Sequence, residues 1–408
     1  MHVEEGKYIY VSDGKIEKIT KSLQGGYDII DLEGKYILPG LINMHVHLAG
    51  NGAHSGKQKD NKKIVDFLFS NPVTRTIAYQ MVCNFAKLEL YGGVTTIRTV
   101  GGLKDLDTRL RNEIKAGKKT GPMILAANEG ITVEGGHMAG SVARVARNNE
   151  EAKRFVEASY AQGVDLVKLM ITGGVLDAKE KGVPGEMKMP EDMIQAICKK
   201  AHQLGLLTIA HVESTEGVKA ALRNGVDSIE HGAKPDQEMM ELFKEKKAFL
   251  ITTLSPALPF ALFDPSVSKV DDTQLFNGKM VFDGIVECSK AALENHIPVG
   301  LGNDVGCPWI TQYDFYRELV YFHKYVGVTN GFAIYTATLQ NAILAGISDI
   351  TGSIDAGKQA DMIVVKENPL DDLNALKNIE LVFTKGKMVH PKIKRDKEIE
   401  QRLDVFCK

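Results

Sequence analysis

The sequence predicts an α/β protein, a closed (β/α)₈ TIM-like barrel with a small β-sandwich domain formed by its two ends. Three observations support this fold class. Eight short apolar segments alternate with amphipathic helical ones, several helices end in glycine directly before a strand, and both ends of the chain carry short β-type runs. A length of 408 residues is enough for one such barrel with a small annex.

The expected parallel strands recur along the chain. Several begin directly after a glycine, as in Tyr-Gly-Gly-Val at 91–94 and Gln-Gly-Val at 162–164. Glycine suits the left-handed conformation that ends a helix, and the valine then opens a buried strand. Eight βα units in series favour a closed barrel, and no Gly-x-Gly-x-x-Gly follows an early strand to indicate a dinucleotide-binding sheet. The expected strands are residues 37–47, 94–100, 122–128, 164–171, 206–212, 226–230, 248–254 and 297–304.

Both ends of the chain have the pattern of hairpin-built sheet. Residues 7–37 alternate β-branched runs with turn pairs such as Asp13-Gly14, and short strands return after about residue 350, at 361–365 and 381–384. The simplest arrangement pairs residues 1–37 with 351–400 in one small domain beside a barrel of residues 38–350.

Composition excludes several classes of partner. The formal net charge of −2 gives no general attraction to nucleic acid or anionic membrane, and charge or glycine interrupts every apolar run too early for it to span a bilayer. Five scattered cysteines and an N-terminus without the pattern of a secretory signal favour the cytoplasm. We expect a small-molecule substrate and no nucleic-acid or membrane partner.

Metal-competent side chains stand at the C-terminal ends of five expected strands, the face where barrel enzymes gather catalytic groups. Strand 1 ends in His45-Val46-His47, and alternation along a strand turns both imidazoles to one side. A single histidine at a strand end is more often a hydrogen-bonded structural residue, but the whole set favours a metal site. The other members are Lys168 in strand 4, His211 in strand 5, His231 in strand 6 and Asp304 in strand 8.

For other polar residues near this face, the sequence leaves two interpretations open: a role in the site, or an ordinary loop or surface position. His137 follows strand 3, and contact with substrate and a bland loop position are equally favoured. Glu213 fits a charged surface as well as a site, and Trp309 is expected to line the pocket. Substrate specificity should come from the loops 48–75, 129–147, 172–189, 255–278 and 305–315. Three cations there could bind a substrate carboxylate, although solvated surface charge is the commoner role: Arg144, Arg147 and Lys188.

At these residues the sequence resembles the amidohydrolase superfamily. Within it, Val-Lys-Leu-Met at 167–170 followed by Thr-Gly-Gly-Val at 172–175 is similar to the prolidase-like dipeptidases and carboxypeptidases, with imidazolonepropionase as a cousin. One departure is Thr99, because relatives often carry aspartate after the strand-2 arginine. The remaining motifs are Leu-Pro-Gly-Leu-Ile-Asn-Met-His-Val-His at 38–47, Ala-His-Val-Glu at 210–213, Ile-Glu-His-Gly at 229–232, Gly-Asn-Asp at 302–304 and the run at 352–361.

The resemblance implies a centre of two divalent metal ions, expected to be Zn²⁺, and a homo-oligomeric protein. Lys168 would be carboxylated and bridge both ions, and its apolar neighbours favour the neutral amine that takes up carbon dioxide. Asp304 would act as general base and then acid, and His137 would hydrogen-bond the developing oxyanion. The implied ligands are His45, His47 and Asp304 for one ion and His211 and His231 for the other.

We therefore expect a binuclear metal-dependent hydrolase that cleaves an amide or peptide bond, in a dipeptide or an N-acyl amino acid, by attack of a metal-bridged hydroxide. Ring opening of a cyclic amide, as in imidazolonepropionase, is the alternative. Deamination is less favoured, since deaminases of the superfamily generally use one metal and no strand-4 lysine. A barrel that binds a ligand without catalysis is the remaining class, and metal analysis would separate it.

Overall fold

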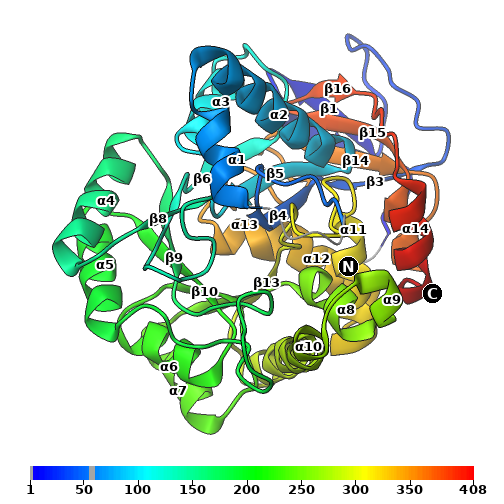
Figure 1. Cartoon of the computed structure of the whole chain (residues 1–408). Helices are drawn as coiled ribbons and strands as arrows, with labels where there is room; N and C mark the ends of the chain where they lie inside the picture. Colours follow the sequence, from blue (N-terminus) through cyan, green and yellow to red (C-terminus); the bar gives the residue numbers. More distant parts are fainter. Residues whose placement is uncertain (1–2, 55–59) are drawn as a thin grey trace.

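A ring of parallel strands surrounded by helices forms the centre of the computed structural model, which describes residues 3–54 and 60–408 (Figure 1). Each expected barrel strand overlaps an observed one, so the predicted fold class is confirmed. The barrel strands are β4 (Leu41–Val46), β5 (Val94–Thr99), β6 (Met123–Ala126), β9 (Leu166–Met170), β10 (Leu207–Val212), β11 (Ser228–His231), β12 (Phe249–Thr252) and β13 (Val299–Leu301).

Backbone hydrogen bonds join the barrel strands in two arcs, β4–β5–β6 and β9–β10–β11–β12–β13. On one side the amide of Asp165 donates to the carbonyl of Ala126 at 2.8 Å, which ties β6 to the segment that enters β9. On the other side Val46 and Val305 form a parallel bridge. These contacts complete the ring.

One side chain reinforces the seam between β4 and β13. Asn341 begins α13 (Asn341–Leu344), is fully buried, and reaches both strands. Its amide nitrogen donates to the carbonyls of Ile42 (2.7 Å) and Leu301 (2.8 Å), and its oxygen accepts from the amide of Leu301 at 3.0 Å. A single asparagine therefore satisfies backbone groups on the first and last barrel strands.

The helices begin and end as the sequence patterns indicate. Gly93, Gly163 and Gly225 follow α2, α4 and α6 with φ of 88°, 73° and 94°, the left-handed conformation expected there. The helices are α1 (Asn61–Leu68), α2 (Pro72–Tyr91), α3 (Leu106–Lys115), α4 (Asn149–Ala161), α5 (Glu191–Gln203), α6 (Thr215–Arg223), α7 (Gln237–Lys246), α8 (Leu254–Leu262), α9 (Pro265–Ser268), α10 (Asp272–Glu294), α11 (Phe315–Tyr321), α12 (Asn330–Tyr335), α13 and α14 (Lys397–Leu403). Among the described helices none is both long and apolar enough to cross a membrane.

Strands from both ends of the chain lie together beside the barrel (Figure 1). The hairpin β1 (Tyr8–Ser12) and β2 (Lys15–Thr20) packs against a four-stranded antiparallel sheet, and Ile16, Met362 and Phe383 share its buried core. The sheet runs in the order β16 (Lys387–Val389), β15 (Ile379–Thr384), β14 (Met362–Val365) and β3 (Tyr36–Pro39).

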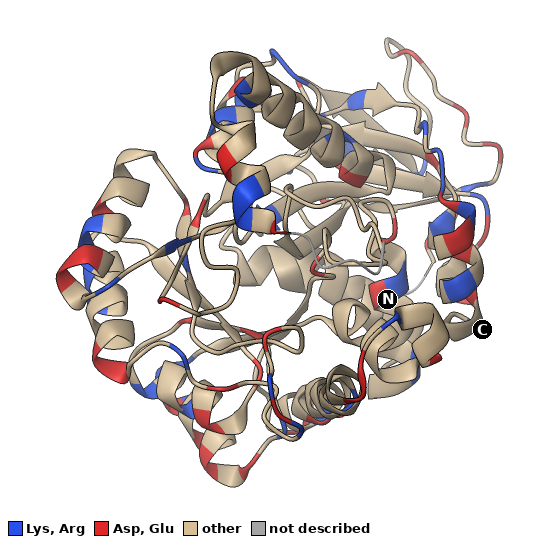
Figure 2. Cartoon of the chain, in the orientation of Figure 1, with Lys and Arg blue, Asp and Glu red and all other residues tan. Residues whose placement is uncertain are grey.

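The loop after the third barrel strand contains structure that the sequence did not predict. β7 (Gly130–Thr132) and β8 (Ala143–Val145) form a short parallel pair, and β7 also contacts β9 through Ile131 and Leu169. The segment that carries His137 is therefore held between two strands rather than in an open loop. Charged residues of both signs alternate over the outer helices (Figure 2).

Candidate metal centre

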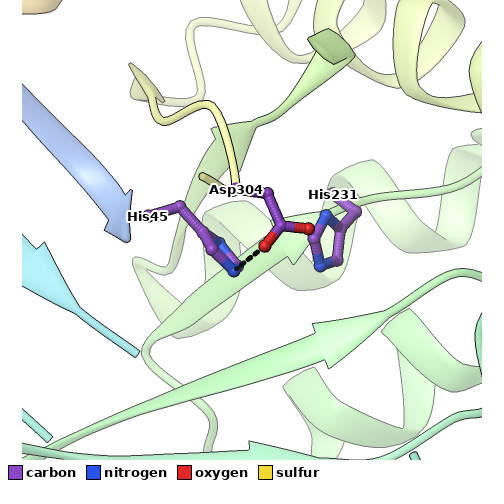
Figure 3. Close-up of side chains that lie close together, drawn as sticks. All are labelled: His45, His231 and Asp304. Atoms are coloured by element: carbon purple, nitrogen blue, oxygen red, sulfur yellow. Dashed lines mark ion pairs between the residues drawn. The ribbon is translucent and has the colours of Figure 1, made fainter. Parts of the chain in front are cut away.

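The polar residues expected at the strand ends meet at the mouth of the barrel. The carboxylate of Asp304 lies between His45 and His231 (Figure 3). Its Oδ1 atom is 3.5 Å from Nε2 of His45 and 3.2 Å from Nε2 of His47. The structure thus brings residues from β4, β11 and the end of β13 to one point.

Two groups of side chains there could each hold a cation. His45, His231 and Asp304 offer ligand atoms that all lie within 4.8 Å of one another, and so do His211, Glu213 and His231. Because His231 belongs to both groups, the two adjoin. Imidazole nitrogen with carboxylate oxygen is a donor set that suits zinc.

Several buried polar atoms at this point have no hydrogen-bond partner among the described residues. They are Oδ1 of Asp304, Oε2 of Glu213 and Nζ of Lys168. Leaving such groups buried and unpaired is costly, and a bound cation would satisfy the two carboxylates. The residues present therefore fit a divalent metal ion.

Burial adjusts the ligand candidates to their metal-binding forms. It lowers the pKa of His45 to about 4 and the pKa values of His211 and His231 well below the usual range, so all three are neutral at pH 7. Burial alone would raise the pKa of Asp304, but His45 and His47 hold it well below its usual value. The site thus combines neutral imidazoles with a carboxylate.

Lys168 lies in the middle of β9 and is 1% exposed. Burial lowers the pKa of its amine to about 8, against the opposing charges of Glu230 and Asp304. About one tenth of the amine is therefore neutral at pH 7, a far larger fraction than in an exposed lysine.

Glu230 is a functional residue that the sequence analysis missed. Its Oε2 lies 2.7 Å from Nδ1 of His45, and its Oε1 accepts from Nη2 of Arg98 and from Oγ of Ser228, each at 2.7 Å. A carboxylate that receives the Nδ1 proton leaves Nε2 free to bind a metal. The sequence signal that could have identified Glu230 is a charged residue on the inward face of a buried strand.

Two other strand-end histidines, His47 and His231, are oriented in a similar way through Nδ1. Nδ1 of His47 lies 2.8 Å from the carbonyl of Gly101, and Nδ1 of His231 lies 2.7 Å from Oγ1 of Thr253. His231 and Asp304 have φ of 70° and 51°, conformations that side-chain-bearing residues adopt at a cost of about 1–3 kcal/mol. Such strain at the ends of β11 and β13 is typical of functional sites.

The structure places His137 against a predicted metal ligand. Its ring stacks on that of His211 with centroids 4.1 Å apart and planes 4° apart. Its Nδ1 lies 2.5 Å from Oδ2 of Asp177, in the loop after β9. Asp177 was not anticipated, because nothing in the sequence marks which loop residue reaches this histidine.

Glu213 points inward, which decides between its two interpretations. Burial, and then the charges of Asp304 and Asp177, raises the pKa of its carboxyl to about 8. A surface glutamate would not meet these conditions, so Glu213 belongs to the site.

Comparison with known proteins identifies the family. The model of the amidohydrolase family matches residues 36–389. The chain belongs to the amidohydrolase family.

A crystal structure of a candidate prolidase from Bifidobacterium longum is 35% identical with a TM-score of 0.85, covering 98% of this chain and 93% of that one. The crystal structure of a Xaa-Pro dipeptidase with methionine bound in its active site is 29% identical with a TM-score of 0.80, covering 94% of each chain. Ochratoxinase from Aspergillus niger is 24% identical over 381 residues, covering 86% of this chain and 75% of its own. These likenesses support an enzyme that hydrolyses amide bonds.

In this amidohydrolase the cations considered for substrate binding are engaged elsewhere. Arg147 forms an ion pair with Glu151 at 2.8 Å. Arg144 donates a hydrogen bond to Oγ of Ser159 at 2.7 Å. Lys188 forms an ion pair with Glu186. All three cations therefore serve as surface or structural charges.

Trp309 is a packing residue in this amidohydrolase, not an open pocket wall. It is 3% exposed, stacks on His54 at 3.7 Å between centroids, and meets Phe263 edge-on at 5.0 Å. Little of its surface is left to touch substrate. Residues 55–59 of the expected specificity loop 48–75 lie outside the described part of the chain.

Proposed function

We propose that this amidohydrolase cleaves the amide bond of a dipeptide or an N-acyl amino acid at a centre of two divalent metal ions, for which zinc suits the donors. The observation that carries the proposal is Lys168, a buried amine with a lowered pKa that has no hydrogen-bond partner among the described residues and lies beside histidines and a carboxylate. The likeness to a Xaa-Pro dipeptidase supports the substrate class.

Lys168 would serve as a carbamate. The lone pair of its neutral Nζ forms a bond to the carbon of carbon dioxide, and one amine proton leaves to solvent. The product is an anion whose two oxygens can bind two cations, which an ammonium group cannot do. His45, His47 and Asp304 would hold one ion and His211 and His231 the other.

The remaining tasks are proton transfer and stabilisation of the developing oxyanion, which side chains of the protein would perform. Bound divalent ions supply Lewis acidity and lower the pKa of water. Asp304 accepts the proton of the attacking water on its carboxylate and passes it to the leaving amine. Asp177 lies 2.5 Å from Nδ1 of His137 and orients its ring, and His137 would hydrogen-bond the oxygen of the carbonyl under attack.

A substrate panel tests the proposal. Zinc-loaded protein is assayed with a dipeptide library, N-acyl amino acids and cyclic amides, with release of the amino acid measured. We expect turnover on members of the first two groups. Turnover confined to cyclic amides would contradict the proposal and favour imidazolonepropionase-like ring opening.

Replacing single histidines should weaken the binding of one ion at a time. We expect His211→Ala and His231→Ala to weaken the same ion, and His45→Ala to weaken the other, because β10 and β11 lie opposite β4 in the barrel. Zinc titration of the metal-free variants measures both affinities, with the exposed helix residue His202→Ala as control. Unchanged binding of two ions by all three variants would show that the ligand set is wrong.

A further inference from the structure

We propose that Glu213 is a protein ligand of the second cation, together with His211 and His231. The proposal deepens the proposed metal centre, but it does not depend on carboxylation of Lys168. Its basis is that ligand atoms of Glu213, His211 and His231 all lie within 4.8 Å of one another. A spacing of this size lets one cation reach all three.

Two contacts hold the main chain of Glu213 in this position. Glu213 follows His211 by two residues, directly after β10, and the alternation of an extended chain places both side chains on the same side. Its amide donates to Oγ1 of Thr172 at 3.1 Å. Gly185 packs so closely on it that a Cβ atom at Gly185 would lie 2.4 Å from the carbonyl carbon of Glu213. The main chain of Glu213 is therefore fixed independently of any ion.

The surroundings of the carboxylate favour a cation. Oε2 of Glu213 is buried and has no hydrogen-bond partner, and no ion pair to Glu213 forms within the described residues. The charged neighbours are two further carboxylates, Asp304 and Asp177, while His137 is already paired with Asp177. Ionising a buried carboxyl beside two other carboxylates is unfavourable, and a divalent ion between Glu213 and the histidines would offset that cost.

Glu213 changes what the second ion requires. Two histidines and one glutamate are a complete set of protein ligands for a hydrolytic zinc ion. The second ion would then remain bound when Lys168 is replaced, whereas two histidines alone would hold it weakly. Glu213 and the bridging lysine can therefore be tested separately.

Metal titration of four metal-free proteins tests the assignment: wild type, Glu213→Gln, Lys168→Ala and the double variant. Zinc content is measured by elemental analysis, and cobalt absorbance reports coordination at each site. We expect Glu213→Gln to weaken one ion by at least about tenfold. Lys168→Ala should retain one ion that the double variant loses.

Control variants separate coordination from general damage. Glu216→Gln changes an exposed glutamate three residues later and should leave both ions unchanged. Glu213→Asp keeps the charge on a shorter side chain and should bind more tightly than Glu213→Gln, and circular dichroism checks that each variant is folded.

Two results would overturn the assignment. One is unchanged metal affinity in Glu213→Gln. The other is unchanged affinity with a raised KM for dipeptides but not for N-acyl amino acids, which would make Glu213 a binding group for the substrate ammonium. Wild-type protein that binds a single ion would contradict the binuclear proposal, yet the effect of Glu213→Gln on that ion would still test the ligand.

Discussion

Replacing Lys168 with alanine should reduce turnover by on the order of 10³-fold, because the variant loses the only anionic group proposed to bridge both ions. Lys168→Arg should be equally impaired, since a guanidinium stays charged and cannot take up carbon dioxide. A small carboxylic acid added to Lys168→Ala should restore part of the activity by filling the vacated position. Initial rates at saturating zinc measure each effect.

The same residue makes activity depend on dissolved carbon dioxide. Protein stripped of metal at mildly acidic pH should lose the carbamate, and reactivation with zinc should be faster in bicarbonate than in degassed buffer. The pKa of the Lys168 amine is lowered to about 8, so its reactive neutral fraction rises with pH. At fixed dissolved carbon dioxide, reactivation should therefore be faster at pH 8.5 than at pH 6.5.

An ordinary lysine that binds substrate as a cation would behave differently. Bicarbonate would then have no effect, and Lys168→Arg would keep activity. Lys200→Ala, which changes a helix lysine paired with Glu157 far from the strand ends, provides the matched control. Electron density for an unmodified amine at Lys168 in fully metallated protein would exclude the carbamate.

Asp304→Asn should lower kcat by at least about 10²-fold while part of the metal is retained. Asparagine keeps the size of the side chain and one oxygen ligand, but it cannot accept and return a proton. The measurement is kcat with metal content determined on the same sample. Asp349→Asn, an exposed aspartate, is the control. Near-normal turnover of a metal-loaded Asp304→Asn variant would place the general base elsewhere.

Much of the barrel could be predicted because its local signals agree with one another. A buried parallel strand needs an apolar run, and a helix that turns directly into such a strand favours glycine, as at Gly93 and Gly163. The pair β7 and β8 could not be predicted, because three-residue strands are set by their neighbours. Ile131 pairs with Leu169 of a strand that begins more than thirty residues later.

In the candidate site, too, some residues could be predicted from the sequence and others could not. His45 and His47 were recognisable because they occupy fixed places at the end of a strand. Glu230 was not, because its role depends on His45 from β4 and Arg98 from β5, which only the closed barrel brings together. Asp177 lies in a loop, whose path the sequence does not specify.

The seam closed by Asn341 has a consequence for the order of events during synthesis. Asn341 lies 299 residues after Ile42, to which it donates a hydrogen bond. At ribosomal rates of about 5–20 residues per second, the first barrel strand would wait roughly 15–60 s for this partner. His45 sits on that strand, and Asp304 emerges only shortly before Asn341. The nascent chain therefore cannot hold a metal ion in the His45–Asp304 pocket until three-quarters of the protein has left the ribosome, and loading of this pocket must be a late step of maturation.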